Sequence, residues 1–149
     1  MGSPRYHFVS HWTVAASPVS AYRALYEVAD YPKWWPEVRD ARKVDDSNLW
    51  MRTRSFLPYD LAFSLHRDIA DEAGGILEAR LEGDLEGRIR WTIAAARSGA
   101  AITFDEDVVT NQPLLNRLAP IARPFFVVNH ALMMSHGQAG LRRYLEGSG

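Results

Sequence analysis

The chain of 149 residues contains no cysteine. It therefore forms no disulfide bond, offers no thiolate for catalysis and cannot build a zinc site from cysteine ligands. A chain without cysteine suits a reducing compartment, and we expect a cytoplasmic protein. The sequence also lacks any apolar run near the roughly 20 residues that a membrane-spanning helix needs, and its start lacks the basic and apolar regions of a secretory signal. We therefore expect no stable insertion into a membrane.

An excess of either charge is also missing, because 17 Lys and Arg residues balance 18 Asp and Glu residues and leave a net charge of −1 at pH 7. Proteins that hold nucleic acid or an anionic membrane by their overall field carry a clear positive excess. We therefore predict no nucleic-acid partner. A phosphate-binding glycine loop and a G-x-S-x-G motif are absent as well. The sequence thus has no motif for a nucleotide-dependent or a serine-hydrolase function, and we predict no cofactor.

The spacing of the histidines does not favour a metal site. His7 and His11 share one face of a predicted strand, but they lie about 13 Å apart along it at about 3.3 Å per residue. His130 and His136 lack the spacing at which two helical histidines bind one metal ion. We therefore predict no bound metal.

Most of the chain has the sequence pattern of β-strands. Apolar and polar residues alternate between positions 6 and 15, which is the pattern of a strand with one buried face. Ser17 followed by Pro18 is typical of a helix start, and apolar residues then recur at helical spacing until about Asp30. Turn residues separate further strand-like segments at 39–44, 49–57, 61–70, 76–81, 88–96 and 101–110. Because no linker or repeat interrupts this meander, we predict one domain over residues 1–149.

The last segment has helical spacing from position 113 onwards. Pro120 and Pro124 should break or kink its first part, so we expect an uninterrupted helix over about 124–145. Gly137 and Gly140 each cost about 1 kcal/mol relative to Ala in a helix interior, which indicates a close approach to another element, most simply the sheet. One helix face combines apolar, polar and small residues, namely Phe126, Asn129, His130, Met133, His136, Gly137, Gly140 and Tyr144.

This order of elements resembles the helix-grip fold of the START-like (SRPBCC) superfamily, which includes polyketide cyclases, dehydrases and lipid-transfer domains. The resemblance covers almost the whole chain and rests on the segments ASPVSAYRALYEVADYPKWWPEV, LPYDLAFSLHRDI, EGDLEGRIRW and NHALMMSHGQAGLRRYL. It implies an α+β fold in which a curved antiparallel sheet of about seven strands wraps around a long C-terminal helix, with a short helix after the first strand.

Members of this superfamily bind or transform apolar small molecules in a cavity between the sheet and the long helix. The resemblance therefore implies binding or carriage of a lipid, a polyketide or an aromatic compound. The alternative is an enzyme of the cyclase, aromatase or dehydratase type, and a third option is a module that binds a protein through an aromatic loop. Fold alone does not choose among these functions. Whether the chain forms a homodimer is also left open.

The aromatic loop is the stretch DYPKWWPEV, in which Trp34 and Trp35 stand side by side between two prolines. A turn that only reversed the chain would be built from Gly, Asn, Asp or Ser. The resemblance implies that the two indoles form a lid or rim at the mouth of the cavity. In one alternative, one indole plugs the end of the core while the other lies on the surface. In another, exposed aromatic side chains mark a surface for a protein partner.

Strand alternation places two charged residues, Arg67 and Glu106, on the otherwise apolar inner face of the sheet. Because a lone buried charge is costly, they should pair with each other, be hydrated in a cavity, or lie where the alternation slips. A bulge would turn Asp105 and Asp107 inward instead. We favour the register that keeps Phe104 inside.

His130 lies on the inner helix face and, with a carboxylate such as Glu106, could serve as a general acid or base in the enolisation or dehydration of a poly-carbonyl compound. Arg67 would then polarise a carbonyl group. The alternative is a structural, hydrogen-bonded histidine. Leu85, in the predicted turn GDLEG, either leans over the cavity or serves the turn alone. We thus predict Glu106 and His130 as catalytic residues, with ligand contacts at Trp34, Trp35, Phe63, Arg67, Leu85, Trp91, Phe104, Phe126, Asn129 and Met133.

Overall fold

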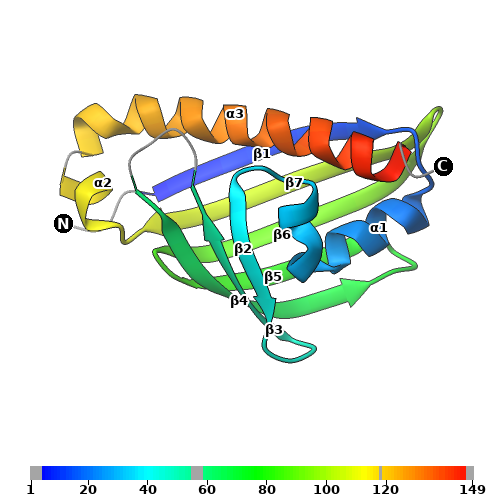
Figure 1. The fold of residues 1–149 in the computed structure, drawn as a ribbon, viewed down its shortest axis with the longest axis horizontal. Helices are drawn as coiled ribbons and strands as arrows, with labels where there is room; N and C mark the ends of the chain where they lie inside the picture. Colours follow the sequence, from blue (N-terminus) through cyan, green and yellow to red (C-terminus); the bar gives the residue numbers. More distant parts are fainter. Residues whose placement is uncertain (1–4, 55–58, 118, 147–149) are drawn as a thin grey trace.

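The computed structural model describes residues 5–54, 59–117 and 119–146. Its frame is one antiparallel sheet in the order β1-β7-β6-β5-β4-β3-β2 (Figure 1). The strands are β1 Arg5–Val14, β2 Val38–Lys43, β3 Asn48–Thr53, β4 Leu61–Asp71, β5 Ile76–Gly83, β6 Leu85–Ala96 and β7 Gly99–Thr110. Strands β2 to β7 form the predicted meander. Strand β1 pairs with β7 and forms one edge of the sheet. The predicted extension of the third strand to residue 57 lies outside the described residues.

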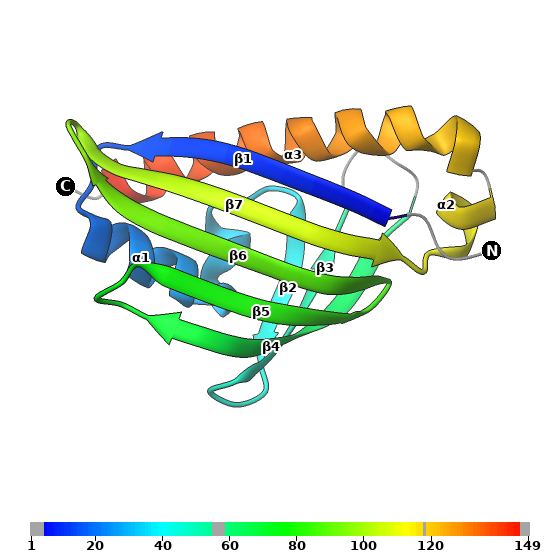
Figure 2. The same ribbon diagram turned by 180° about the vertical axis from the view of Figure 1, so that it is seen from behind.

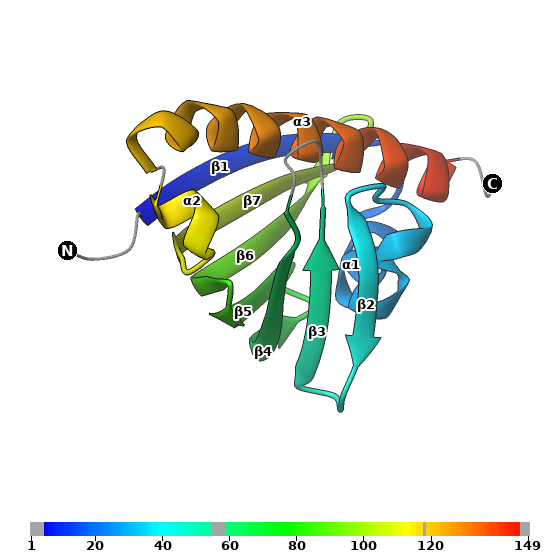
Figure 3. The same ribbon diagram turned by 60° about the vertical axis from the view of Figure 1, so that its left-hand side comes forward.

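The helices occupy the concave side of this sheet (Figures 1 and 3). Helix α1 spans Pro18–Tyr26 and starts as expected, because the Ser17 side chain accepts a hydrogen bond of 3.1 Å from the backbone N–H of Ser20. The expected helix to about Asp30 is wrong at its end, because α1 stops at Tyr26 and is followed by the 3₁₀ helix η1, Val28–Lys33, with Pro32 inside it. Proline lacks the N–H that an α-helix needs and restricts the preceding residue.

Helix α2 spans Pro113–Arg117, and the long helix α3 spans Ala119–Glu146. The expected start of the long helix at Pro124 is wrong, because α3 begins five residues earlier and Pro124 lies inside it. Pro120 falls in the first helical turn, where a backbone N–H has no intrahelical partner to lose. Among the described residues, none of the helices combines the length and the hydropathy that crossing a membrane requires.

The sheet curls around α3, and Figure 2 shows its convex side. The α+β helix-grip fold that the resemblance implies, with seven antiparallel strands and a short helix after the first, is confirmed.

Strand β7 alternates as expected. Phe104 and Glu106 are each only 7% exposed on the inner face. Asp105 and Asp107 lie on the outer face, where the carboxylate of Asp107 accepts a hydrogen bond of 3.0 Å from Arg5. The register that keeps Phe104 inside is therefore confirmed.

Strand β4 departs from the expected alternation near its end. A register shift between Arg67 and Ile69 places Arg67 opposite Ala79 but Ile69 opposite Glu78. Directly opposite residues of an antiparallel pair share a face, and Glu78 forms an ion pair with Arg90 on the outer face. Regular alternation over residues 61–70 predicts Ile69 on the inner face with Arg67, and this prediction is wrong because the bulge turns Ile69 outward.

The second half of α3 packs closely on aromatic side chains. A Cβ atom on Gly137 would lie 2.6 Å from Cε2 of Trp35 and 2.8 Å from Cη2 of Trp12. A Cβ atom on Gly140 would collide with the backbone carbonyl oxygen of Trp34. The two glycines thus allow the expected close approach, and its partners are the aromatic loop as well as the sheet.

We predict that Gly140→Ala destabilises the protein, although Ala is the better helix former by about 1 kcal/mol. Overpacking against a backbone oxygen cannot be relieved by a side-chain rotation, so we expect a net loss of about 2 kcal/mol. Urea unfolding followed by tryptophan fluorescence measures the change. Ser135→Ala, at an exposed position of the same helix, is the control and should stay within about 0.5 kcal/mol of the wild type. A more stable Gly140→Ala variant would contradict this packing.

Candidate functional site

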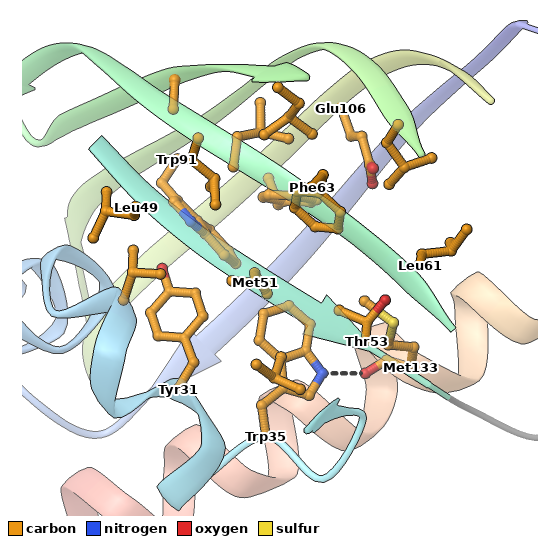
Figure 4. Close-up of a pocket in the computed structure, with 18 of the residues that line it drawn as sticks. Tyr31, Trp35, Leu49, Met51, Thr53, Leu61, Phe63, Trp91, Glu106 and Met133 are labelled. Carbon is orange, nitrogen blue, oxygen red and sulfur yellow. Dashed lines mark hydrogen bonds between the residues drawn. The ribbon is translucent and has the colours of Figure 1, made fainter. Parts of the chain in front are cut away.

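A cavity lies between the concave face of the sheet, η1 and the first half of α3 (Figure 4). The volume open to the centre of a water molecule is about 100 Å³. One water molecule needs roughly 10–15 Å³ by this measure, so the space is larger than a packing defect. Its wall is mostly aliphatic and aromatic, with side chains that include Leu25, Leu49, Met51, Phe63, Leu65, Trp91 and Phe104.

The wall contains one buried acid–base pair, which joins the sheet to α3. Nε2 of His130 lies 2.8 Å from Oε1 of Glu106, and both residues are 7% exposed. When Glu106 is ionised, Nε2 must carry the hydrogen and donate it to the carboxylate. The imidazole ring also stacks on Phe8, with 3.8 Å between the ring centroids and 10° between the ring planes. The histidine is thus fixed from two sides, and Figure 4 shows the carboxylate directed toward the interior.

Glu106 and Arg67 are not paired with each other. The carboxylate of Glu106 has His130 as its partner. Nη2 of Arg67 instead donates a hydrogen bond of 3.1 Å to the backbone carbonyl oxygen of Tyr26, and its guanidinium lies 4.0 Å from the centre of the Tyr26 ring. This contact is a cation–π interaction. Both charged residues line the cavity, so of the three expectations for them, pairing with each other is wrong.

Three polar atoms of cavity residues are buried and lack a hydrogen-bond partner among the described residues: Oδ1 of Asn129, the hydroxyl of Tyr59 and Nε of Arg67. Leaving a buried polar group unpaired costs about 1–3 kcal/mol. Water or a ligand in the cavity would remove this cost. Burial raises the pKa of Tyr59 to about 12, so its hydroxyl keeps its proton at neutral pH and is available as a donor.

All of the predicted site residues except Trp34 line this one cavity; they are Trp35, Phe63, Arg67, Leu85, Trp91, Phe104, Glu106, Phe126, Asn129, His130 and Met133. The geometry thus brings them together around one space. Their roles in catalysis or in ligand contact remain predictions.

Both tryptophans of the aromatic loop are buried, Trp34 with 4% and Trp35 with 3% of its surface exposed. The alternatives that place one or both of them on the surface are therefore wrong. Trp35 forms part of the cavity wall, and its Nε1 donates a hydrogen bond of 2.9 Å to the carbonyl oxygen of Met133 (Figure 4). Trp34 stacks on Trp35, with 5.3 Å between the ring centroids, and packs against Gly140.

Sequence reasoning missed several lining residues. Leu49, Met51 and Thr53 alternate along β3, and the same period-two argument that we applied to β7 could have found them. Tyr59 lies in a predicted turn between two strands, and no periodic pattern points to it. Tyr31 lies in η1, where its hydroxyl donates a hydrogen bond of 2.6 Å to the carbonyl oxygen of Leu25.

No three His, Asp or Glu side chains gather as a set of metal ligands within the described parts of the chain.

The chain is similar to proteins of a known family. A family model described as polyketide cyclase/dehydrase and lipid transport matches residues 14–126. A comparison with curated proteins gave no match.

Solved structures share the fold over nearly their whole length. The Zhui aromatase/cyclase from a Streptomyces species is 14% identical, with a TM-score of 0.68 over 95% of this chain and 96% of that one. A START superfamily protein from Mycobacterium smegmatis is 18% identical, with a TM-score of 0.66 over 97% and 99% of the two chains. A protein from Thermus thermophilus is 13% identical, with a TM-score of 0.76 over 97% and 99%. Similarity at these identities shows a common fold only.

The different positions of the two tryptophans give a direct test. Trp35→Phe removes the hydrogen bond that ties the cavity wall to Met133, and a hydrogen bond of this kind contributes about 0.5–1.5 kcal/mol. We expect the variant to bind the apolar dye phenylnaphthylamine about threefold more weakly or worse. Trp34→Phe is the matched control and should bind the dye as the wild type does. A fluorescence titration measures the two affinities. Equal losses of affinity in both variants would contradict the assignment of Trp35 to the cavity wall and of Trp34 to the core behind it.

Proposed function

The chain belongs to the polyketide cyclase/dehydrase and lipid transport family, and we propose that it binds an apolar small molecule, such as a lipid, a polyketide or an aromatic compound, between the sheet and α3. One observation carries this proposal: an apolar wall surrounds a cavity and is interrupted by only a few polar groups at fixed positions. Ligand sites typically have this composition, since the apolar wall supplies affinity and the polar groups fix the orientation.

The apolar part of the wall favours rings or chains over charged molecules. Phe63, Trp91 and Phe104 are each at most 7% exposed and lie along the cavity. Each Å² of apolar surface that a ligand removes from water contributes roughly 25 cal/mol. A ligand with a rigid ring system would use most of this wall with little loss of conformational freedom.

The polar groups of the wall favour a ligand that also carries oxygen. The Glu106 carboxylate can accept a hydrogen bond from a ligand hydroxyl, because a carboxylate has more acceptor positions than the one that His130 occupies. The hydroxyl of Tyr59, which has no partner among the residues that the structure describes, can donate to a ligand carbonyl group. We therefore propose an apolar ligand with hydroxyl or carbonyl groups rather than a plain hydrocarbon.

Two matched compounds test the role of Glu106. β-Naphthol offers a hydroxyl donor and naphthalene does not, so the wild type should bind β-naphthol more tightly. Glu106→Gln keeps the side-chain shape but replaces a charged acceptor by a neutral one, which weakens the hydrogen bond by about 1 kcal/mol. We expect calorimetry to show that this variant loses about fivefold in affinity for β-naphthol and little for naphthalene. Glu86→Gln, at an exposed position of β6, is the control, and equal wild-type affinities for the two compounds would argue against the proposal.

A second candidate function is acid–base catalysis on a poly-carbonyl compound, and the buried pair of His130 and Glu106 favours it. One member of the pair would take a proton from the carbon next to a carbonyl group and leave an enolate. The proton would then pass to a hydroxyl group of the substrate, which departs as water while the new double bond forms. The Nε–H of Arg67 has no partner within the described parts of the chain and could stabilise the enolate oxygen at the other end of the ligand.

The two candidate functions differ in what His130→Gln does. A general acid or base contributes about 10²-fold or more to kcat, so an enzyme should lose turnover of a poly-carbonyl compound by that factor. The affinity for phenylnaphthylamine, which needs only the apolar wall, should change little. Steady-state kinetics and dye titration on the same preparation measure the two effects. Turnover that survives the substitution would exclude His130 as the acid or base.

A further inference from the structure

The outer side of α3 carries an exposed apolar surface that the cavity does not explain. Ile121, Phe125, Val128 and Leu132 are 70%, 57%, 53% and 43% exposed. Their spacing of four, three and four residues aligns them along one side of the helix. We call these four residues the outer stripe.

The opposite side of the same turns faces the cavity, with Phe126 and Met133 in its wall. Apart from Arg123, Asn129 and His130, this half of α3 is therefore apolar on both sides. A helix that is apolar all round is normally buried all round. In the described part of the chain, however, no strand or helix lies over the outer side (Figure 3). Monomeric proteins rarely expose a large contiguous apolar patch unless something binds there.

The sequence segment that carries the outer stripe contains charged residues of one sign only. From position 108 to position 145 the sequence contains no Asp or Glu, although the whole chain has a net charge of −1. The same segment contains four exposed arginines. Arg123 and Arg142 donate hydrogen bonds to the backbone carbonyl oxygens of Arg5 and Thr13 in β1, and the other two are Arg117 in α2 and Arg143 in α3. At about 100° per residue, Arg143 lies on the same helix side as Phe125. A positively charged side chain therefore lies beyond the C-terminal end of the stripe, on the same side of the helix.

We propose that the outer stripe docks on the surface of an anionic lipid membrane, with α3 parallel to the surface. The four apolar side chains would enter the boundary between headgroups and acyl chains, and Arg143 would bind a lipid phosphate. A protein partner fits less well, because protein interfaces carry about one hydrogen bond per 100–200 Å² and the stripe offers no polar side chain. This contact is peripheral, which agrees with the absence of a membrane-spanning helix among the described residues.

Docking in this orientation would place the cavity wall next to the lipid. Phe126 and Met133 lie one residue from Phe125 and Leu132, so the same helical turns would contact the ligand on one side and the membrane on the other. An apolar ligand dissolved in the bilayer could then enter or leave without crossing water.

Vesicle flotation with the full chain tests the proposal. We expect the protein to float with vesicles of phosphatidylcholine and phosphatidylglycerol, and to float much less with phosphatidylcholine alone or at high salt. The double variant Phe125→Ser/Leu132→Ser should bind the mixed vesicles at least tenfold more weakly, because it removes two inserted side chains. Val44→Ser is the matched control, since Val44 is 71% exposed in the turn between β2 and β3, away from α3.

Three results would overturn the proposal. The first is a wild type that stays unbound to the mixed vesicles. The second is a double variant that floats as the wild type does. The third is a wild-type dimer in size-exclusion chromatography with light scattering that the double variant converts to a monomer, because the stripe would then be the contact between two copies of the chain. Wild-type affinity of the double variant for β-naphthol shows that the cavity is intact, so a failure of docking is distinguishable from a failure of ligand binding.

Discussion

Close contact between α3 and the aromatic loop sets the geometry on which the cavity depends. Gly137 and Gly140 let the second half of the helix lie directly against Trp12, Trp35 and the backbone of Trp34. Further towards its N-terminal end the helix contacts the loop through the hydrogen bond from Trp35 to the carbonyl oxygen of Met133, and Phe126, His130 and Met133 line the cavity. The cavity therefore lies beside the part of the helix that reaches the sheet through a few side chains, and not beside the part that the two glycines bring into close packing.

Burial of the Glu106–His130 pair lowers the stability of the fold. A carboxylate taken out of water loses several kcal/mol of solvation, which one hydrogen bond only partly offsets. Replacing the pair by apolar side chains of similar volume would serve the core at least as well. A polar pair that packing does not require lies at the wall of an apolar cavity, and this is the reason why we propose that it acts on a ligand.

The sequence predicts the fold well where two faces of an element differ strongly. Alternation in β7 fixed Phe104 and Glu106 inside, and the Ser17–Pro18 step located the start of α1. The bulge after Arg67 leaves no such pattern, and Pro124 stays inside α3 because tertiary packing outweighs a local preference. The candidate site is harder to predict from the sequence. Trp34 and Trp35 are chemically identical neighbours, and only the packing of α3 decides which of them reaches the cavity.

The central claim is that the cavity holds an apolar ligand. Native mass spectrometry of the protein purified from its source organism tests it most directly, with an Ala79→Phe variant for comparison, because Ala79 lines the cavity and a phenyl ring there would fill it. We expect the wild type to carry an apolar, oxygen-containing adduct that the variant lacks, with equal circular dichroism spectra for both. An adduct that persists in the variant, or a wild type that remains ligand-free after incubation with a lipid extract of that organism, would contradict the account.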